Sequence, residues 1–248
     1  MAVAHGSKDP RAAATVSGLL AMVRSRAVAW GLAGLDVKAA FLDHCAPSLP
    51  QVLGSVEDAD CVVVPLLLTA AYHSKTDIPA KLAAARFDVS CADTLGPHPL
   101  LLAAAERRLG ESGAPVRDRA ARARTSVVLA AAGSSDPAAN ATIASLAARW
   151  QARGGWRAVV PAYASATGPR PDEAVSALLA ESGGPVVVAT YLLAPGFFAD
   201  KIRKAGLRAG AAAVSPALGA APEIADVILE RYLAAVPAEV CGPLLARA

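Results

Sequence analysis

Short apolar runs that end in polar turns alternate along the chain with segments whose apolar residues recur at helical spacing. The clearest run, Val62 to Ile78, reads VVVPLLLTAAYHSKTDI. Such a short Val/Leu-rich run predicts a strand buried on both faces of a parallel sheet. The polar residues after it predict a helix start, with Ser74 or Thr76 as N-cap. His73 is therefore expected just beyond a central strand, where open α/β sheets bind ligands.

The first ten residues show the same arrangement. His5 follows the apolar Met1–Ala4 and precedes Gly-Ser-Lys-Asp-Pro. Only four residues are available for this strand, so either the strand is very short or the true start lies upstream of Met1. From Asp9-Pro10, helical spacing of apolar residues predicts a helix to about Arg26. We expect His5 and His73 to face each other across one cleft.

The same pattern predicts the other elements of the first half. Ser48 is expected to cap the helix that opens at Pro47–Pro50. Gly110 to Arg124 is polar and contains Gly and Pro, which is typical of a linker. Further strands are expected at 35–42, 60–69 and 89–93, and further helices at 78–85 and 100–109.

After this linker the pattern repeats. Four blocks recur in the same order, which indicates an internal duplication of a whole α/β domain. The matching blocks are Ala132–Pro137 with His5–Pro10, Val186–Val188 with Val62–Val64, Phe197–Ile202 with His73–Ile78, and Leu218-Gly219 with Leu95-Gly96. The sequence predicts an α/β fold of two similar doubly wound parallel-sheet domains, residues 1–115 and 116–248, with a cleft between them. Because Ala132 and Phe197 replace the two histidines, we expect one chemical site per chain, with the second domain as the other wall.

Composition excludes several function classes. A net charge of +3 without blocks of like charge is too mild for a dedicated nucleic-acid binder. The four cysteines form no C-x-x-C pair, which argues against zinc knuckles and iron–sulfur clusters and fits a reducing compartment. The apolar run 186–199 is too short to span a membrane. We expect a cytoplasmic protein with no nucleic-acid or membrane partner.

Two imidazoles on adjacent strand ends can bind a first-row divalent metal and can accept protons. Asp43 is expected at the end of the second strand, where it has three possible roles. It could be a third metal ligand, or a carboxylate that orients an imidazole. It could also be an acidic residue at the N-terminus of the next helix, with no part in the site. His44 would point to the other face of an extended chain and is expected at the surface. His98, between two prolines, is expected in a turn.

The Gly6-Ser7-Lys8 turn can cradle a carboxylate or phosphate with its backbone N–H groups, although it lacks the spacing of a P-loop. No G-x-S-x-G elbow is present, which argues against a Ser–His–Asp hydrolase. Cations near the expected mouth suit an anionic ligand. They are Lys8, Arg11, Lys75 and Lys81 in the first half and Lys201, Arg203 and Lys204 in the second.

Four segments of the chain share a pattern with one known family: Ala4–Pro10, Ala40–Asp43 with Pro47–Leu49, Val63–Pro79, and Leu95–Pro97. Taken together they resemble the sirohydrochlorin chelatase family, class II chelatases that insert Co²⁺ or Fe²⁺ into a tetrapyrrole in cobalamin or sirohaem synthesis. The first half is the stronger match and the second a degenerate copy. The sequence departs from the family at Asp43, where Glu is usual, and at Ala46, which is often acidic.

The resemblance implies ATP-independent insertion of a divalent metal, with His5 and His73 as catalytic residues. The same two histidines and Asp43 would handle the metal, which is a substrate, so no permanently bound cofactor is expected. Fe²⁺ is favoured and Co²⁺ is the other candidate. A monomer is expected because the fused repeat supplies both lobes. Sirohydrochlorin, rich in carboxylates, would contact Ser7, Lys8, Tyr72, Lys75, Phe197 and Phe198.

Two other function classes stay open. A non-catalytic tetrapyrrole or metal carrier would keep the histidines but show no turnover. A metal-dependent hydrolase would need a further carboxylate cluster, which is not seen near His5 or His73.

Overall fold

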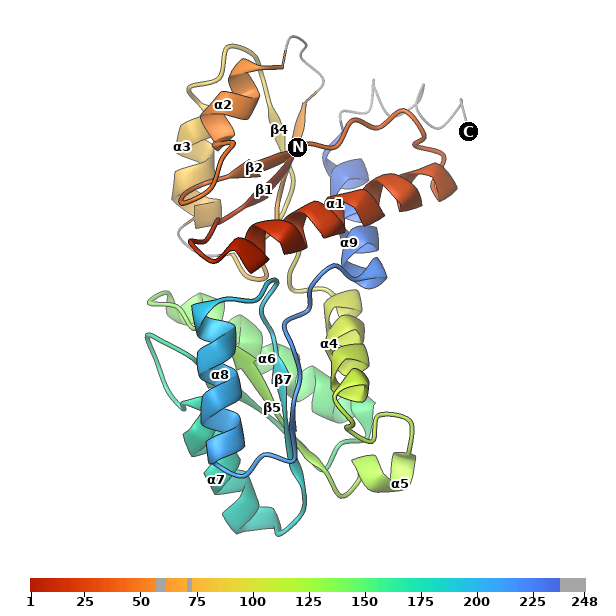
Figure 1. Ribbon diagram of the computed structural model, residues 1–248, viewed down its shortest axis with the longest axis vertical. Helices are drawn as coiled ribbons and strands as arrows, with labels where there is room; N and C mark the ends of the chain where they lie inside the picture. Colours follow the sequence, from red (N-terminus) through yellow and green to blue (C-terminus); the bar gives the residue numbers. More distant parts are fainter. Residues whose placement is uncertain (57–60, 71–72, 237–248) are drawn as a thin grey trace. The chain divides into compact units, whose positions relative to one another are not determined.

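The computed structural model describes residues 1–56, 61–70 and 73–236 (Figure 1). They form two compact units: a first unit of residues 1–100 with residues 220–236, and a second unit of residues 101–219. Each unit contains a four-stranded sheet, in the order β2-β1-β3-β4 in the first and β6-β5-β7-β8 in the second. All strand pairs are parallel, which confirms the predicted α/β class.

The expected division at residue 115 does not coincide with the boundary between the two units. Each unit contains one helix that the expected division gives to the other. Most of α4 (Pro99–Glu111) belongs to the second unit, where Arg108 Nε donates to the Leu218 carbonyl oxygen over 2.8 Å. Helix α9 (Pro222–Ala235) belongs to the first unit, where Asp226 pairs with Arg26 of α1. The sequence pattern could not show this exchange because both helices are simply amphipathic.

The strands of the first unit are shorter than predicted. The apolar runs continue past the last paired residue, so the pattern overestimated the strands. They are β1 (Ala2–Ala4), β2 (Ala39–Phe41), β3 (Val62–Pro65) and β4 (Ser90–Cys91). In the register, Ala2 lies opposite both Ala39 and Val64, so β1 lies between β2 and β3.

The helices of the first unit begin largely where local signals place them. Asp9 caps α1 (Pro10–Ala29), and Ser48 forms a capping box with Gln51 at the start of α2 (Leu49–Gly54). The predicted caps Ser74 and Thr76 are wrong. They lie inside a π-helical turn, His73–Asp77, which leads directly into α3 (Ile78–Leu82).

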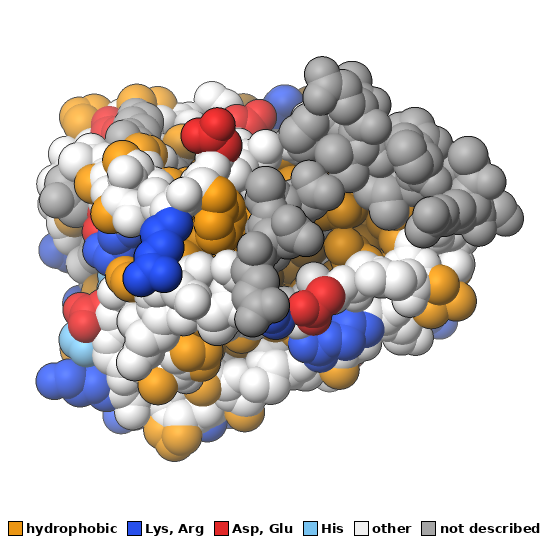
Figure 2. Space-filling model, turned by 90° about the horizontal axis from the view of Figure 1, so that it is seen from above, with side chains coloured by type: hydrophobic (Ala, Val, Ile, Leu, Met, Phe, Trp, Pro, Cys, Tyr) orange, Lys and Arg blue, Asp and Glu red, His pale blue; other side chains and the backbone are white. Residues whose placement is uncertain are grey.

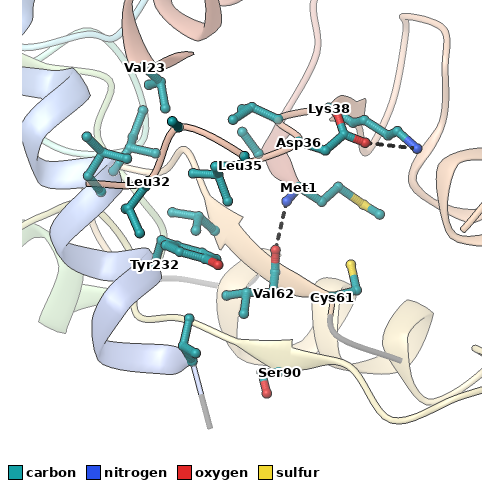
Figure 3. Close-up of a pocket in the computed structure, with 18 of the residues that line it drawn as sticks. Met1, Val23, Leu32, Leu35, Asp36, Lys38, Cys61, Val62, Ser90 and Tyr232 are labelled. Atoms are coloured by element: carbon teal, nitrogen blue, oxygen red, sulfur yellow. Dashed lines mark hydrogen bonds and ion pairs between the residues drawn. The ribbon is translucent and has the colours of Figure 1, made fainter. Parts of the chain in front are cut away.

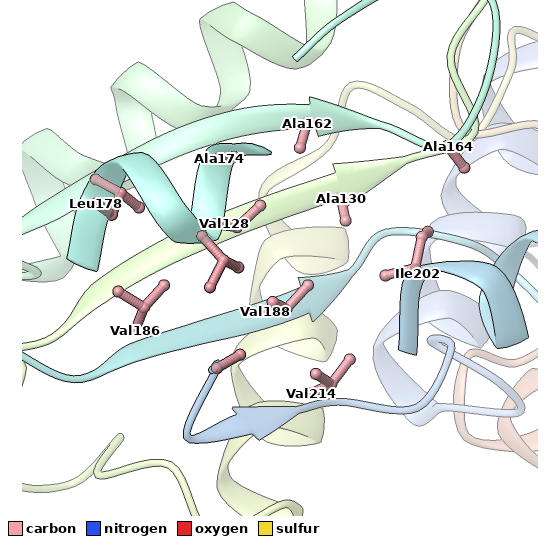
Figure 4. Packing of buried hydrophobic residues seen from close by; sticks show 12 residues of the cluster. Val128, Ala130, Ala162, Ala164, Ala174, Leu178, Val186, Val188, Ile202 and Val214 are labelled. Atoms are coloured by element: carbon pink, nitrogen blue, oxygen red, sulfur yellow. The ribbon is translucent and has the colours of Figure 1, made fainter. Parts of the chain in front are cut away.

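The second unit has the longer strands: β5 (Ser126–Ala131), β6 (Ala158–Tyr163), β7 (Val186–Thr190) and β8 (Ala213–Val214). Its further helices are α5 (Arg119–Arg122), α6 (Pro137–Gly154), α7 (Pro171–Ser182) and α8 (Phe197–Arg208). In the core of the second unit, valines of β5 and β7 pack with Ile202 of α8 (Figure 4). The predicted linker contains α5, whose Arg122 pairs with Glu106 of α4.

The internal duplication extends to the loops that follow the first two strands of each unit. Asp43 N–H donates to the His5 carbonyl oxygen, and Ser165 N–H donates to the Ala132 carbonyl oxygen, both over 2.9 Å. His44 and Ala166 hold matching left-handed φ values of 61° and 62°. The two units therefore share one loop geometry, although only the first has imidazoles there.

The helices of the described residues include none both long enough and apolar enough to cross a bilayer. On the face shown in Figure 2, acidic and basic side chains are interspersed rather than gathered into a stripe of one sign.

Candidate metal-handling site

The loops after β1 and β2 are fastened to each other at the carboxyl edge of the first sheet. Gly6 has a φ of +92°, and a Cβ there would lie 1.8 Å from the Asp43 carbonyl oxygen. Ser7 N–H donates to Cys45 Sγ over 3.4 Å, and Cys45 Sγ donates to the Ser7 carbonyl oxygen over 3.0 Å. These contacts bring the side chains of His5, Asp43 and His44 to one edge.

The same loop leads into α1 through short-range hydrogen bonds. Ser7 Oγ accepts from Asp9 N–H over 3.1 Å, and Asp9 accepts from Arg11 N–H over 2.9 Å. The Arg11 side chain also donates to this carboxylate and holds the pKa of Asp9 below its ordinary value. Ser134 and Asp136 repeat the Ser7–Asp9 contact in the second unit over 3.0 Å. The Ser7 hydroxyl therefore has a structural role that both units need.

His5 is exposed, and its Nδ1 lies 3.0 Å from the Gly6 carbonyl oxygen. A carbonyl oxygen only accepts, so this contact assigns the proton of the neutral ring to Nδ1. Nε2 then carries the lone pair that a metal ion or a proton would use.

Asp43 and His44 form a second part of the site. Asp43 Oδ1 accepts from His44 N–H over 2.7 Å, while Oδ2 lies 3.4 Å from His44 Nε2. The rings of His44 and His5 have centroids 6.5 Å apart and are tilted by 50°. His44 is exposed, as expected, but the expectation that it points away from the site was wrong. That expectation assumed an extended backbone, whereas the left-handed turn places its ring beside His5.

The structure places His73 at the start of the π-helical turn, well beyond Pro65 rather than directly at a strand end. Since β1 and β3 are neighbours, His5 and His73 do follow adjacent strands, as predicted. Tyr72 and the side chains of His73 and Lys75 lie outside the described residues. The convergence of the two imidazoles therefore stays a prediction.

The other predicted contact residues are at the surface. Lys8 is exposed, and Phe197 at the start of α8 is 75% exposed, with the Phe198 ring 5.5 Å away. Lys201 Nζ donates to the Ala164 carbonyl oxygen over 2.6 Å. His98 has a structural role, since its Nε2 lies 2.9 Å from Glu230 and its Nδ1 accepts from Leu100 N–H.

Across the described ranges, no three His, Cys, Asp or Glu side chains are close enough together to hold a metal ion. A cavity of about 560 Å³ lies in the first unit away from these histidines, with Met1, Leu32, Val62 and Tyr232 among its lining residues (Figure 3). Met1 and Cys61 precede β1 and β3, so this cavity lies at the amino ends of the strands, opposite to His5.

Comparison with known proteins fits this arrangement. The chain is 26% identical over 210 residues to the sirohydrochlorin cobaltochelatase of Priestia megaterium, covering 82% of this chain and 66% of that protein. It is 30% identical over 147 residues to the sirohydrochlorin ferrochelatase of Bacillus subtilis, covering 57% of this chain and 54% of that protein. The chain thus spans about two thirds and about half of the length of these two relatives.

Solved structures show the same fold. SirB from Bacillus subtilis with Fe³⁺ superposes with a TM-score of 0.75 at 24% identity, covering 98% of this chain and 96% of that one. SirB from Bacillus subtilis subspecies spizizenii in complex with cobalt gives 0.71 at 21% identity, covering 95% and 93%. The CbiX family profile matches residues 1–112 and again 126–235, once for each half of the duplication. The chain therefore belongs to the CbiX family.

Proposed function

We propose that this chain inserts a divalent metal ion into sirohydrochlorin. The observation that carries the proposal is the His5 imidazole, oriented by Gly6 so that Nε2 holds the lone pair, on the strand next to the one that leads to His73. The sirohydrochlorin chelatases among the relatives, found for both cobalt and iron, support the same activity.

Metallation requires the ion to lose water and the macrocycle to lose two pyrrole N–H protons. One imidazole nitrogen cannot hold the ion and accept a proton at the same time, because both use the same lone pair. A pair of imidazoles can divide these tasks, with one holding the ion and the other accepting protons. The metal is a substrate in transit, so an open and incomplete ligand set suits its release.

The choice of metal, the pathway and the substrate contacts are proposed from the resemblance to the family. Fe²⁺ is the favoured metal and Co²⁺ the other candidate, since imidazole accepts both. Sirohaem or cobalamin synthesis would use the product. ATP independence, a monomeric state and a cytoplasmic location belong to the same proposal. The predicted substrate contacts remain Ser7, Lys8, Tyr72, Lys75, Phe197 and Phe198.

The test is the shift of the sirohydrochlorin Soret band with Fe²⁺ or Co²⁺ under anaerobic conditions, with and without protein and with and without ATP. We expect acceleration over the protein-free reaction, most of it lost in His5→Ala and in His73→Ala. Phe197→Ala is expected to cost little. His98→Gln is the matched control, because it removes a histidine that already pairs with Glu230.

Wild-type rates in both His5→Ala and His73→Ala would refute the assignment. Stoichiometric binding of the pigment without turnover would instead identify a carrier. Assays with the two metals in parallel decide between iron and cobalt.

A further inference from the structure

The turn after β2 presents a histidine where its counterpart in the second unit has alanine. Cys45 N–H donates to the Asp43 carbonyl oxygen, and Thr167 N–H donates to the Ser165 carbonyl oxygen, both over 2.7 Å. The central residues, His44 and Ala166, share the same left-handed φ. The turn therefore forms without an imidazole, and the fold alone does not account for His44.

The side chains of Asp43 and His44 are spaced as two ligands of one ion would be. The 3.4 Å between Nε2 and Oδ2 exceeds the usual hydrogen-bond range of about 2.7–3.2 Å. Two ligand atoms about 2.1 Å from one tetrahedral ion would lie about 3.4 Å apart, and about 3.0 Å apart at a right angle. The backbone amide of His44 fixes the other oxygen of Asp43, so this carboxylate is already oriented.

The His5 ring lies beside this pair, just outside the reach of the same ion. With a metal–nitrogen distance of about 2.1 Å, the centroid of a bound imidazole lies about 3.2 Å from the metal, so two bound rings have centroids at most about 6.4 Å apart. The observed 6.5 Å between His5 and His44 lies just beyond this limit, so in the described arrangement the two rings do not share one ion.

We propose that His44 is a further metal-binding residue, which with Asp43 takes up the divalent ion from solvent at the mouth of the site and passes it to His5. This inference rests on the proposed function for the fate of the ion, but the binding step itself does not require the tetrapyrrole. The Asp43 carboxylate adds the negative charge that attracts a hydrated cation. The Nε2 lone pair of His44 then replaces one of its waters.

The experiment is a titration of the purified full chain with Co²⁺, followed by its visible absorption bands and by calorimetry. His44→Ala introduces the residue that holds the equivalent turn in the second unit, and His44→Gln keeps more of the side-chain volume. His98→Gln is again the control for loss of one histidine. We expect the Kd for Co²⁺ to rise about tenfold or more in both His44 variants. Losing even a residue that only orients a metal ligand weakens metal binding by about this factor. It should stay within about twofold in the control.

In the sirohydrochlorin assay, the His44 variants are expected to raise the KM for the metal more than they lower kcat. Wild-type Kd values in both His44 variants, or an equal loss in His98→Gln, would overturn the inference. Circular dichroism of each variant separates weaker binding from loss of fold. Co²⁺ binding that depends on His44 without any metallation would refute the proposed function alone. Rapid metallation that is indifferent to His44 would refute this inference alone.

Discussion

Replacing Gly6 by alanine tests whether the loop after β1 fits as closely against Asp43 as the structure shows. The added Cβ would lie 1.8 Å from the Asp43 carbonyl oxygen and 2.9 Å from its carbonyl carbon. Both are backbone atoms, so no side-chain rotation relieves the overlap. The left-handed φ of +92° adds a second cost, because alanine rarely adopts it.

The two costs can be estimated separately. The left-handed conformation costs a residue with Cβ about 1–2 kcal/mol. Forced displacement of packed atoms typically adds about 1–3 kcal/mol. Gly113→Ala isolates the first cost, since Gly113 has a φ of +88° with open space around it. We therefore expect Gly6→Ala to lower the free energy of unfolding by about 2–5 kcal/mol and Gly113→Ala by about 1–2 kcal/mol.

Gly133→Ala is the matched change in the second unit. Its φ is +85°, and the new Cβ would lie 2.1 Å from the Ser165 carbonyl oxygen. Urea unfolding followed by circular dichroism should show similar destabilisation for Gly6→Ala and Gly133→Ala. Co²⁺ titration of the folded proteins should show weaker binding only for Gly6→Ala, because Asp43 and His44 must move. A Gly6→Ala protein as stable as Gly113→Ala would refute the close contact.

Three further predictions concern stability. Asp9→Asn should lower the Tm at neutral pH. Because Arg11 lowers the pKa of Asp9 in the folded protein, this carboxylate stabilises the fold above about pH 4 and loses its effect as the pH falls. The Tm difference between wild type and variant should therefore shrink on acidification, and a constant difference would contradict the argument. Leu129→Ala, in fully buried β5, should cost about 2–5 kcal/mol in urea unfolding, and a loss below about 1 kcal/mol would show that the site collapses or is less buried. Asp226→Asn breaks a partly exposed ion pair with Arg26 and should cost at most about 1 kcal/mol, measured in a double-mutant cycle with Arg26→Met. A larger coupling would mean that this pair, rather than apolar packing, holds α9 on α1.

Local signals in the sequence were sufficient for several elements. The helical spacing of apolar residues after Asp9-Pro10 predicted α1, and its Val16, Leu19, Leu20 and Val23 are all buried. The start of α1 at Asp9-Pro10 and the Ser48 cap of α2 were also correct, because a cap depends on a side chain and amides within three residues of it. The four repeated blocks led to the duplicated fold and, with the histidine motifs, to the family.

Features that depend on distant partners were decided only by the tertiary structure. Hydrophobic runs report burial, but a strand ends where its neighbour stops pairing, so β3 ends at Pro65 rather than at Thr69. The exchange of α4 and α9 between units depends on which surface each amphipathic face meets. The position of His44 beside His5 depends on a left-handed turn held by the loop after β1, and no periodicity of residues encodes that turn. The sequence by itself determined the fold class and predicted the pair His5 and His73. Only tertiary packing brought His44 to the same edge as His5, because backbone hydrogen bonds between separate loops set its direction.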